Sequence, residues 1–462
     1  MGVHINRNHT DFARRDVGTM SEDGHLTAAQ IVELSKRHTL YDWQAQAKVM
    51  PLPVQRAEGV YFYTTDGTRY LDFNSQLMGV NIGHGDKRVL DAIAKQGQTL
   101  PYISPFMAFE TRALLGQKLA SLWPGEMEKA FFTLGGAEAN ENALRMAKAY
   151  TGRQKIMVRY RSYHGATAQT IALTGDPRRW ANESPPLPGI VRVLDPYHGT
   201  QRGFEGSDTA LAMLRETIEL EGPDTIAAFM LETVTGTNGI LIPPEGYLKG
   251  VRDLCTEFGI VMIADEVMCG FGRTGEWFAV NHYDVVPDLM STAKGLTSSY
   301  MPLGAVAISP AIAEHFQDNV FWGGLTYNSH PLSCAAALAT IKVMEDDDLV
   351  GNAKRLGESM RRHHEDLAAR HPSVGRYRNL GLFGILELVK DRDTLEPLSR
   401  FNVQNETAQA INRALLDRGL FTMVRWNGIM TNPPLCISAE QLQDGFAIID
   451  EVLEIADAAM VQ

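Results

Sequence analysis

The sequence predicts an α/β protein: a large domain, with a mainly parallel sheet flanked by helices, joined to a smaller α+β domain. Between about residues 85 and 340, short apolar runs alternate with longer amphipathic stretches, which is typical of βαβ units. This pattern changes after about residue 341, and 462 residues exceed the roughly 250–300 that one hydrophobic core serves. We therefore expect an N-terminal arm and small-domain segment over 1–74, the large domain over 75–340 and the C-terminal small domain over 341–462.

The N-terminal segment shows one short helix and one hairpin. Helical spacing covers Thr27–His38. Val60–Ser75 alternates between apolar and polar residues, turns at Asp66-Gly67 and alternates again. This pattern indicates a β-hairpin.

Three apolar runs predict strands of the large sheet. Lys129–Thr133 precedes a glycine pair and a helical stretch, whereas Ile226–Glu232 and Ile260–Glu266 are almost continuously apolar. Such runs suit strands that helices cover on both faces. Helical spacing over Gly246–Phe258, between the last two runs, completes a βαβ unit and predicts parallel strands.

The C-terminal part predicts long helices around a short strand. Helical spacing covers about 342–370 and 403–419, and Leu382–Val389 between them has the pattern of a strand. A last helix is expected over about 439–459.

Composition excludes several classes of protein. The net charge is −12 and no long basic run appears, so a nucleic-acid partner is not expected. The four cysteines are far apart, without the spacing of a zinc site or a disulfide framework. No stretch approaches about 18 uninterrupted apolar residues, so we expect no membrane span. The polar N-terminus has no secretory apolar core, and we expect a cytoplasmic location.

Three strand ends carry residues suited to chemistry, and ligands of open α/β sheets bind beyond such ends. At the first, Gly135-Gly136 lies between a strand and a helix, where backbone N–H groups cradle a phosphate or simply form a tight turn. No Lys-Ser or Lys-Thr pair follows, so this is not a P-loop. A nucleotide-binding protein using this turn is therefore disfavoured.

Asp265 ends the most apolar run in the chain. A carboxylate there is costly unless it meets a cation, such as the protonated nitrogen of a pyridine ring. The alternative is a carboxylate that caps the next helix.

Lys294 stands among small uncharged residues, whereas most lysines here lie in charged helical contexts. A desolvated lysine has a lowered pKa and acts as a nucleophile and proton carrier. A surface lysine is the alternative. Between the glycine pair and Asp265, Tyr163 is placed to stack on a flat ring or to pack in the core, and His164 to form structural hydrogen bonds. Taken together in this order, the residues favour a cofactor site.

At this point the chain resembles the class III aminotransferases, the ω-transaminases of the fold type I pyridoxal-phosphate enzymes. The resemblance runs from about Asp42 to the C-terminus, and its most specific part is the spacing DEV…GFGRTG…K, from Asp265 to Lys294. The matching segments are FFTLGGAEAN, YHG, LIPPEGYL, IADEVMCGFGRTGEWFA, TAKGL, GGLTYNSHPLSCAAALA and NPPLCI. Within the family, SQLMGVNIGHG, TLGGAEANENA and RYRSYHGATA are similar to taurine–pyruvate and amine–pyruvate enzymes.

The resemblance implies a role for each matching residue, with pyridoxal 5'-phosphate as cofactor. Lys294 bonds to the cofactor, Asp265 pairs with its ring nitrogen, and Val267 and Tyr163 cover its two faces. Gly135, Gly136 and Ala137 hold the phosphate through their backbone, although many relatives have a serine at Gly135. The resemblance also places His164 and Glu232 near the cofactor, Thr326 at a phosphate of the neighbouring subunit, Arg425 on an α-carboxylate and Trp43 at the pocket entrance.

These roles predict a homodimer with shared active sites; pairing of dimers into tetramers is left open. They predict ping-pong transfer of an amino group from a primary amine or ω-amino acid, such as taurine or β-alanine, to a keto acid, with pyruvate expected before 2-oxoglutarate. In that reaction Lys294 is general base and acid. An aminomutase, decarboxylase or racemase on the same scaffold stays open as the alternative. The sequence does not identify the amine donor or its handedness.

Overall fold

The computed structural model describes residues 26–182, 187–197 and 206–460. The chain forms two compact units, which are described separately. One comprises the described part of Met1–Ala57 with Phe62–Arg69, and the other comprises Glu58–Tyr61 with Tyr70–Gln462. The division into domains at residues 74 and 340 stays a prediction.

The described part of the N-terminal unit contains α1 (Ala28–His38), the 3₁₀ helix η1 (Gln46–Lys48) and the strands β1 (Val54–Glu58) and β2 (Tyr61–Thr64). A capping box starts α1. Thr27 Oγ1 accepts from the backbone N–H of Gln30 at 3.3 Å, and Gln30 Oε1 accepts from the backbone N–H of Thr27 at 2.8 Å. Two N–H groups without helical partners are thus satisfied, and the predicted helix is confirmed.

The predicted hairpin is also confirmed, with its second arm in β3 (Arg69–Asp72). The backbone N–H of Thr64 bonds to Thr68 O at 3.0 Å, and Asp66 Oδ1 accepts from the N–H of Thr68 at 3.0 Å. Gly67 has a φ of +86° at this turn, a region that favours glycine.

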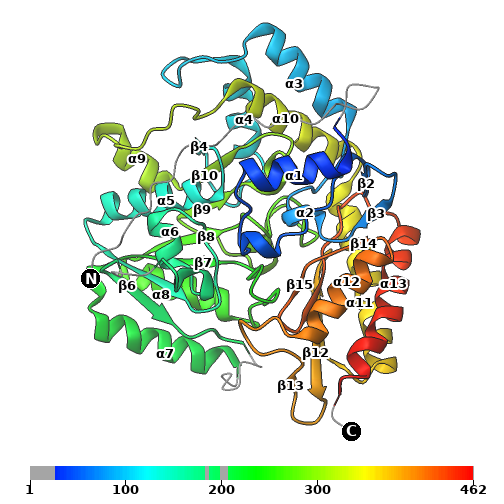
Figure 1. Cartoon of the computed structure of the whole chain (residues 1–462). Coiled ribbons are helices and arrows are strands. Elements are labelled where there is room, and N and C mark those ends of the chain that lie inside the picture. Colours follow the sequence, from blue (N-terminus) through cyan, green and yellow to red (C-terminus); the bar gives the residue numbers. More distant parts are fainter. Residues whose placement is uncertain (1–25, 183–186, 198–205, 461–462) are drawn as a thin grey trace, which may run out of the picture. The chain divides into compact units, whose positions relative to one another are not determined.

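A seven-stranded sheet organises the larger unit (Figure 1). Its strands, in spatial order, are β4 (Lys129–Thr133), β10 (Gly304–Ile308), β9 (Leu289–Thr292), β8 (Val261–Asp265), β7 (Ile226–Glu232), β5 (Lys155–Arg159) and β6 (Ile190–Val193). The pairs β6–β5, β5–β7, β7–β8 and β8–β9 are parallel, and only β10 runs against the others. The mainly parallel sheet is therefore confirmed.

Helices cover both faces of the sheet. Alternate residues of a strand point to opposite faces, so the residues of β7 belong to two different cores. Ala228 and Met230 of β7 belong to a core cluster with residues of α5 (Gly136–Thr151). Phe229 and Leu231 belong to another core that includes α8 (Tyr247–Phe258). All seven residues of β7 are buried, and a fully buried side chain of Met or Leu size contributes about 1.5–3 kcal/mol to stability.

The remaining helices of the larger unit mostly follow or connect these strands. They are α2 (Ser75–Met78), α3 (Lys87–Thr99), α4 (Glu110–Ala120), α6 (Ala168–Leu173), η2 (Pro177–Arg179), α7 (Gly206–Glu221), η3 (Pro223–Thr225), η4 (Ala279–Tyr283), η5 (Lys294–Leu296), α9 (Pro310–Asp318) and α10 (Pro331–Asp346). Across the described ranges, no helix combines the length and apolar character that crossing a membrane requires. The same ranges contain no cluster of three or more His, Cys, Asp or Glu side chains suited to a metal ion.

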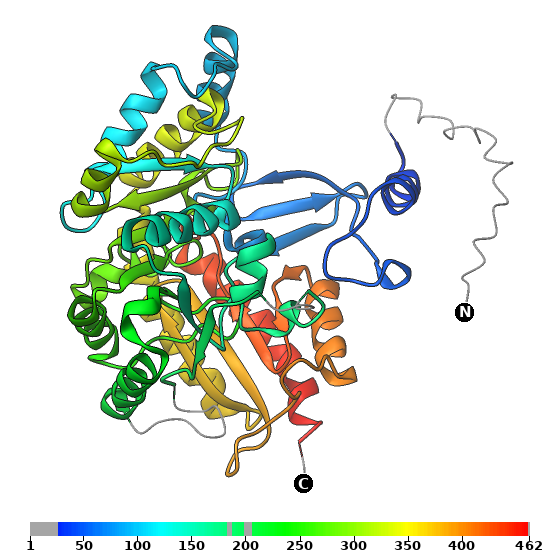
Figure 2. The ribbon, with the colours of Figure 1, turned by 90° about the vertical axis from the view of Figure 1, so that its left-hand side faces the viewer.

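The C-terminal part forms a second sheet with helices beside it. Its strand order is β11 (Val374–Leu380), β12 (Phe383–Asp391), β16 (Gly428–Thr431) and β15 (Val424–Arg425), and β13 (Glu396–Pro397) pairs with β12. The helices are α11 (Leu349–Arg370), α12 (Glu406–Asp417) and α13 (Ala439–Asp457). Figure 2 shows these yellow, orange and red elements together, and α13 packs on both α11 and α12.

The predicted C-terminal elements are present with one difference. The expected helix over 342–370 is two helices, α10 and α11, because the chain turns at Asp348, whose φ is +48°. The strand over Leu382–Val389 and the two later helices are confirmed. Finally, β14 (Leu420–Phe421) pairs in parallel with β3, joining Leu420 to Leu71 in register.

Candidate active site

The carboxyl ends of neighbouring parallel strands bring the predicted site residues together. Glu232 at the end of β7 is in register with Asp265 at the end of β8, and Asp265 is in register with Ser291 on β9. These ends border a cavity of about 430 Å³. Nine of the residues predicted from the sequence line it: Gly135, Gly136, Ala137, Tyr163, His164, Glu232, Asp265, Val267 and Lys294.

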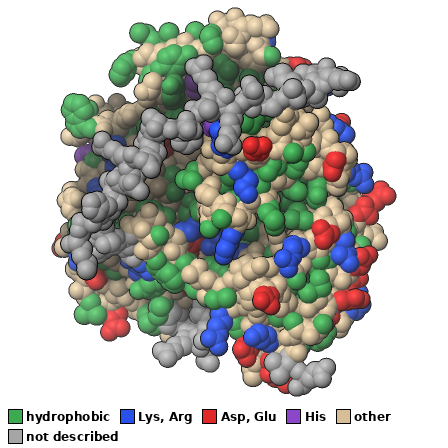
Figure 3. All heavy atoms as spheres, viewed as in Figure 1, with side chains coloured by type: hydrophobic (Ala, Val, Ile, Leu, Met, Phe, Trp, Pro, Cys, Tyr) green, Lys and Arg blue, Asp and Glu red, His purple; other side chains and the backbone are tan. Residues whose placement is uncertain are grey.

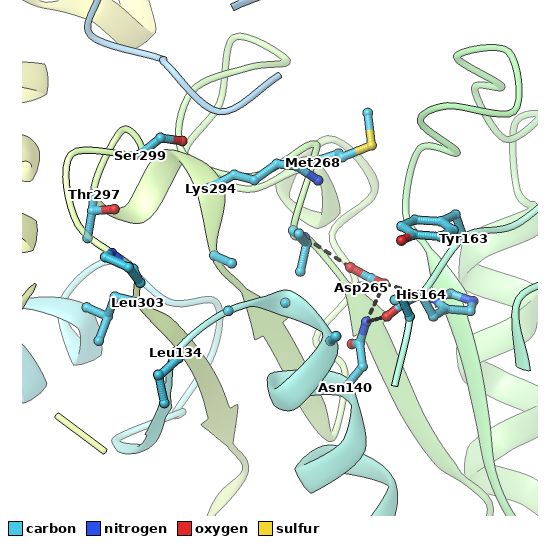
Figure 4. Close-up of a pocket in the computed structure, with 18 of the residues that line it drawn as sticks. Leu134, Asn140, Tyr163, His164, Asp265, Met268, Lys294, Thr297, Ser299 and Leu303 are labelled. Carbon is cyan, nitrogen blue, oxygen red and sulfur yellow. Dashed lines mark hydrogen bonds and ion pairs between the residues drawn. The ribbon is translucent and has the colours of Figure 1, made fainter. Parts of the chain in front are cut away.

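Asp265 is held by three hydrogen bonds and is 3% exposed. Its Oδ2 accepts from Asn140 Nδ2 and from His164 Nδ1, both at 2.8 Å, and its Oδ1 accepts from the backbone N–H of Val267 at 3.1 Å. The dashed lines in Figure 4 mark these contacts. Oδ1 therefore keeps capacity for a further donor, as a carboxylate that faces a protonated ring nitrogen requires.

Lys294 follows β9 on a tightly packed turn and has a φ of +34°. A Cβ on Gly79 would lie 2.4 Å from Ser299 Oγ and 3.6 Å from Lys294 Cβ, so the Gly79 segment packs directly on this turn. Figure 4 shows the Lys294 side chain extending into the cavity toward the side where Tyr163, His164 and Asp265 lie.

Burial lowers the pKa of Lys294, and it outweighs the opposing effect of the Asp265 and Glu232 carboxylates. Desolvation penalises the charged ammonium, which leaves more of the amine neutral at a given pH. Lys294 is therefore not an ordinary surface lysine, and its role as a nucleophile and proton carrier stays a prediction.

The glycine pair forms the start of α5. Gly135 is the N-cap in a fully extended conformation, with no side-chain cap, and the helix begins at Gly136. The first N–H groups of a helix have no partner within it, and the helix dipole favours an anion there. A Cβ on Gly136 would lie 2.8 Å from Val267 Cγ1, whereas a Cβ on Gly135 would meet nothing within 4 Å. Gly136 therefore permits the close packing of Val267, and Gly135 leaves open space.

Glu232 braces two loops of the site. Its Oε1 accepts from the backbone N–H of Tyr163 at 3.0 Å, and its Oε2 accepts from the backbone N–H of Gly236 at 2.8 Å. Burial and the nearby Asp265 raise the pKa of Glu232, and His164 opposes this shift. The carboxylate fixes the backbone of Tyr163, whose ring lines the cavity (Figure 4).

Arg425 and Thr326, predicted to contact the substrate and the cofactor, are not among the residues that line this cavity. Arg425 on β15 is partly buried, and its Nη2 donates to Asp176 Oδ2 at 3.1 Å. Thr326 has an exposed side chain, and its carbonyl accepts from Tyr102 Oη at 2.8 Å. Trp43 belongs to the N-terminal unit and is 63% exposed. The roles of all three stay predictions.

Sequence reasoning missed three residues of this region: Asn140, Asp176 and Arg178. Asn140 lies one turn into the helix after the glycine pair, and its spacing there was a usable signal. Asp176 and Arg178 lie at the start of η2, where an acidic N-cap before proline looks like an ordinary helix start.

Comparison with known proteins agrees with this geometry. The model of the family described as aminotransferase class-III matches residues 43–453. The putrescine–pyruvate aminotransferase of Pseudomonas aeruginosa is 31% identical, over 91% of this chain and 97% of that protein. The taurine–pyruvate aminotransferase of Bilophila wadsworthia is also 31% identical, over 93% and 97%.

A solved structure is similar throughout. It is the taurine:2-oxoglutarate aminotransferase from Bifidobacterium kashiwanohense in complex with PLP and glutamate, with a TM-score of 0.92, 37% identity and coverage of 95% of this chain and 100% of that one. The chain therefore belongs to the class III aminotransferases, enzymes that use pyridoxal 5'-phosphate to transfer amino groups.

Proposed function

We propose that the enzyme transfers an amino group from an ω-amino acid or another primary amine to pyruvate, in two half-reactions with ping-pong kinetics. The half-buried Lys294, which lines one cavity together with Asp265, is the observation that carries this proposal. The names of the pyruvate-dependent relatives support the choice of acceptor.

The residues of the cavity fit the cofactor. The first backbone N–H groups of α5 lie where a phosphate would be held, and Asp265 Oδ1, which accepts from the N–H of Val267, could accept also from the ring nitrogen. His164 Nε2 is buried and, within the described residues, has no hydrogen-bond partner, which suits a histidine at the edge of a ligand site. Gly136 lets Val267 reach the position where it would cover one face of the ring.

When bound, the cofactor supplies an electron sink for negative charge at the substrate carbon. Lys294 Nζ, whose pKa burial lowers, would remove the proton from the carbon that bears the amino group. Asp265 would face the ring nitrogen, and Asn140 and His164 hold its carboxylate in place. Tyr163 and Met268, which line the cavity, exclude water from the reacting carbon.

Arg425 is proposed to bind the α-carboxylate of the keto acid. A guanidinium binds a carboxylate with two parallel hydrogen bonds, which orients the adjacent carbonyl. Because Arg425 is only partly buried and pairs with Asp176 in the present structure, it has an internal partner when the substrate has no carboxylate.

A homodimer is also part of the proposal. Phe106 and Trp322 are 94% and 83% exposed, and Met107 and Tyr327 near them are exposed as well. Tyr102 Oη bonds to the carbonyl of Thr326, which joins the segments that carry these residues. Figure 3 shows hydrophobic side chains gathered at the top of the molecule, over α3 and the segment after it. A second copy covering this surface would bring Thr326 to the neighbouring phosphate site.

A panel of donors and acceptors tests the function. β-Alanine, taurine, putrescine and 1-phenylethylamine would each be incubated with pyruvate or 2-oxoglutarate, and the amino acid formed would be measured by chromatography. We expect alanine to accumulate from an ω-amino acid with pyruvate, with parallel double-reciprocal lines. Glutamate as the main product would overturn the choice of pyruvate. Carbon dioxide, an isomer or a racemate formed without an amino-acid product would replace transamination by one of the rival reactions.

A further inference from the structure

A second cavity, of about 940 Å³, lies within the larger unit and shares no described lining residue with the cavity that holds Lys294. Its walls come from β11, β12 and β13, from the β12–β13 connection and from the segments that follow β5, β13 and β15. Small-molecule sites are cavities of about 300–1,000 Å³, so this cavity has room for a ligand of its own.

Arginines give the second cavity a positive wall. Three of them line it, namely Arg161, Arg376 and Arg400. The acidic residues among its described lining residues are Glu387 and Glu396. The Glu387 carboxylate already accepts from Arg378 Nη2 at 2.7 Å, and Arg378 is not one of the lining residues. The positive charge of the wall is therefore not balanced within it, in a chain whose net charge is −12.

Much of the hydrogen-bonding capacity of these arginines is unused. Arg161 Nη2 donates to the carbonyl of Asn238 at 2.8 Å, but Arg161 Nε is buried and has no acceptor within the described residues. Over the same residues, the guanidiniums of Arg376 and Arg400 take part in no hydrogen bond or ion pair. Because buried N–H groups usually have acceptors, Arg161 Nε indicates that an acceptor from outside the chain belongs here.

The electrostatic surroundings of Arg161 favour an anion as well. Burial lowers the pKa of Arg161, and the nearby charge of Arg378 adds to the shift, while Asp195 and Glu387 oppose it. The two carboxylates therefore do not fully compensate the buried positive charge. An anion bound beside Arg161 would supply the missing compensation.

Two aromatic rings line the cavity beside Arg161. The centroids of Phe401 and Trp426 are 4.4 Å apart, and their planes are tilted by 52°. The Arg161 guanidinium carbon lies 5.2 Å from the Phe401 centroid and 5.9 Å from that of Trp426. Trp426 is 9% exposed, whereas Phe401 is 42% exposed and so keeps ring surface for a ligand. A flat ring can stack on Phe401, next to the guanidiniums.

These features define the chemistry of the ligand. Guanidiniums bind carboxylates and phosphates through paired hydrogen bonds. A phosphate monoester carries about 1.5 to 2 negative charges at neutral pH and three acceptor oxygens, which matches three arginines better than a single carboxylate does. The exposed face of Phe401 adds a preference for a flat ring.

We propose that the second cavity binds a phosphate monoester with a flat ring, such as a nucleoside monophosphate, with the phosphate held by the three arginines and the ring on Phe401. The proposal goes beyond amino-group transfer, because none of these residues lines the cavity of Lys294. The start of α5, where the cofactor phosphate is expected, belongs to that other cavity. In the holoenzyme the cofactor fills that position, so an added phosphate monoester reports on the second cavity.

The first experiment measures binding to the holoenzyme by calorimetry. AMP and phenyl phosphate carry a phosphate and a flat ring, adenosine carries the ring alone, and inorganic phosphate carries the anion alone. We expect the tighter of the two esters to bind about 10-fold or more tightly than adenosine and about 5-fold or more tightly than inorganic phosphate. Binding of that ester no tighter than adenosine or inorganic phosphate overturns the proposal, as does the absence of binding by both esters.

The second experiment locates the site with variants of the holoenzyme. Arg376→Gln and Phe401→Ala each remove one contact, and Arg362→Gln is the matched control, because Arg362 on α11 is exposed and does not line the cavity. We expect Arg376→Gln to weaken the tighter ester about 10-fold or more, Phe401→Ala to weaken it about 5-fold or more, and Arg362→Gln to bind it like the wild type.

Thermal melts establish that each variant is folded. Should Arg376→Gln fail to fold, Arg400→Gln at an exposed position of the same wall repeats the test with the same expected loss. Ester binding that is unchanged in a folded arginine variant, or weakened equally in Arg362→Gln, would place the ligand elsewhere and overturn the assignment.

Discussion

Asn140 Nδ2 donates a hydrogen bond to Asp265 Oδ2 at 2.8 Å, although the two residues are 125 positions apart in the chain. The same amide nitrogen donates to the carbonyl of His164 at 2.8 Å. His164 Nδ1 also contacts Asp265. Asn140 on α5 and His164 after β5 therefore both hold the carboxylate at the end of β8. The position of Asp265 thus depends on residues that do not themselves carry out chemistry.

Asn140→Ala should therefore weaken the cofactor site. The loss of a hydrogen bond to a charged group costs about 1.5–3 kcal/mol, so we expect the Kd for pyridoxal phosphate to rise about 10- to 100-fold. Asn142→Ala is the matched control, because Asn142 lies on the same helix and donates to Glu138 O. Equilibrium dialysis would measure both, and equal affinities in the two variants would count against the role of Asn140.

Lys294 should titrate below ordinary lysines in the cofactor-free protein. Burial lowers its pKa from 10.5, so Nζ becomes neutral and reactive at lower pH than exposed amines. Competitive labelling with acetic anhydride across pH, followed by peptide mapping, would report this. Because Asp265 raises the pKa of Lys294, Asp265→Asn should move its titration to still lower pH. Titration of Lys294 together with exposed lysines would contradict the prediction.

The two glycines at the start of α5 should respond differently to alanine. Gly136→Ala places a Cβ 2.8 Å from Val267 Cγ1, and such overpacking costs about 1–3 kcal/mol of the free energy of unfolding. Gly135→Ala meets nothing within 4 Å and should be nearly neutral. Thermal melts of both variants, with cofactor affinities, test this; a larger loss in Gly135→Ala would reverse the assignment.

Gly135→Ser should strengthen the grip on the phosphate. The extended backbone at Gly135 accepts any residue, and the open space there accommodates a hydroxyl. One added hydrogen bond to a charged oxygen is worth about 1.5 kcal/mol, which is roughly a 10-fold lower Kd for the cofactor. Gly135→Ala isolates the effect of the hydroxyl, and indistinguishable affinities for the two variants would rule out a phosphate at this turn.

His371 should make stability depend on pH. Its Nδ1 lies 2.7 Å from Asp457 Oδ2 and its Nε2 lies 2.6 Å from Asp450 Oδ1, both on α13. Although burial opposes it, these two bonds raise the pKa of His371 above 6.5. A raised pKa in the folded state stabilises the protein below the unfolded value of about 6.5 and loses effect as pH rises through the folded value.

His371→Gln should accordingly lower the Tm more at pH 6 than at pH 9. The measurement is a thermal melt of both proteins at the two pH values. His363→Gln is a control for loss of a histidine without these carboxylates, since His363 stacks on Phe446. A Tm difference for His371→Gln that is the same at both pH values would contradict the ion-pair account.

Local patterns predicted the sheet and the centre of the site because both depend on short-range chemistry. The continuous apolar runs ending in Glu232 and Asp265 required coverage on both faces, and parallel pairing then placed the two carboxylates side by side. Lys294 follows the next strand and so arrives at the same edge. This part of the site follows from strand direction alone.

Local sequence patterns could not predict contacts between segments that lie far apart in the chain. Asp176 and Arg425 are 249 positions apart, and nothing in either segment indicates the other. β15 has only two residues, too few for a recognisable period, and the break at Asp348 needs a positive φ that aspartate adopts only in suitable surroundings. The sequence therefore predicts individual helices and strands from the spacing of their residues. Which of these elements contact one another is known only from the three-dimensional structure.

The covalent bond between Lys294 Nζ and pyridoxal phosphate is the most direct test of the account. Holoenzyme reduced with sodium borohydride would be digested and mapped by mass spectrometry. The account predicts one modified residue, Lys294, and no modification in Lys294→Ala. A cofactor adduct on any other lysine, or none in the wild-type enzyme, would contradict it.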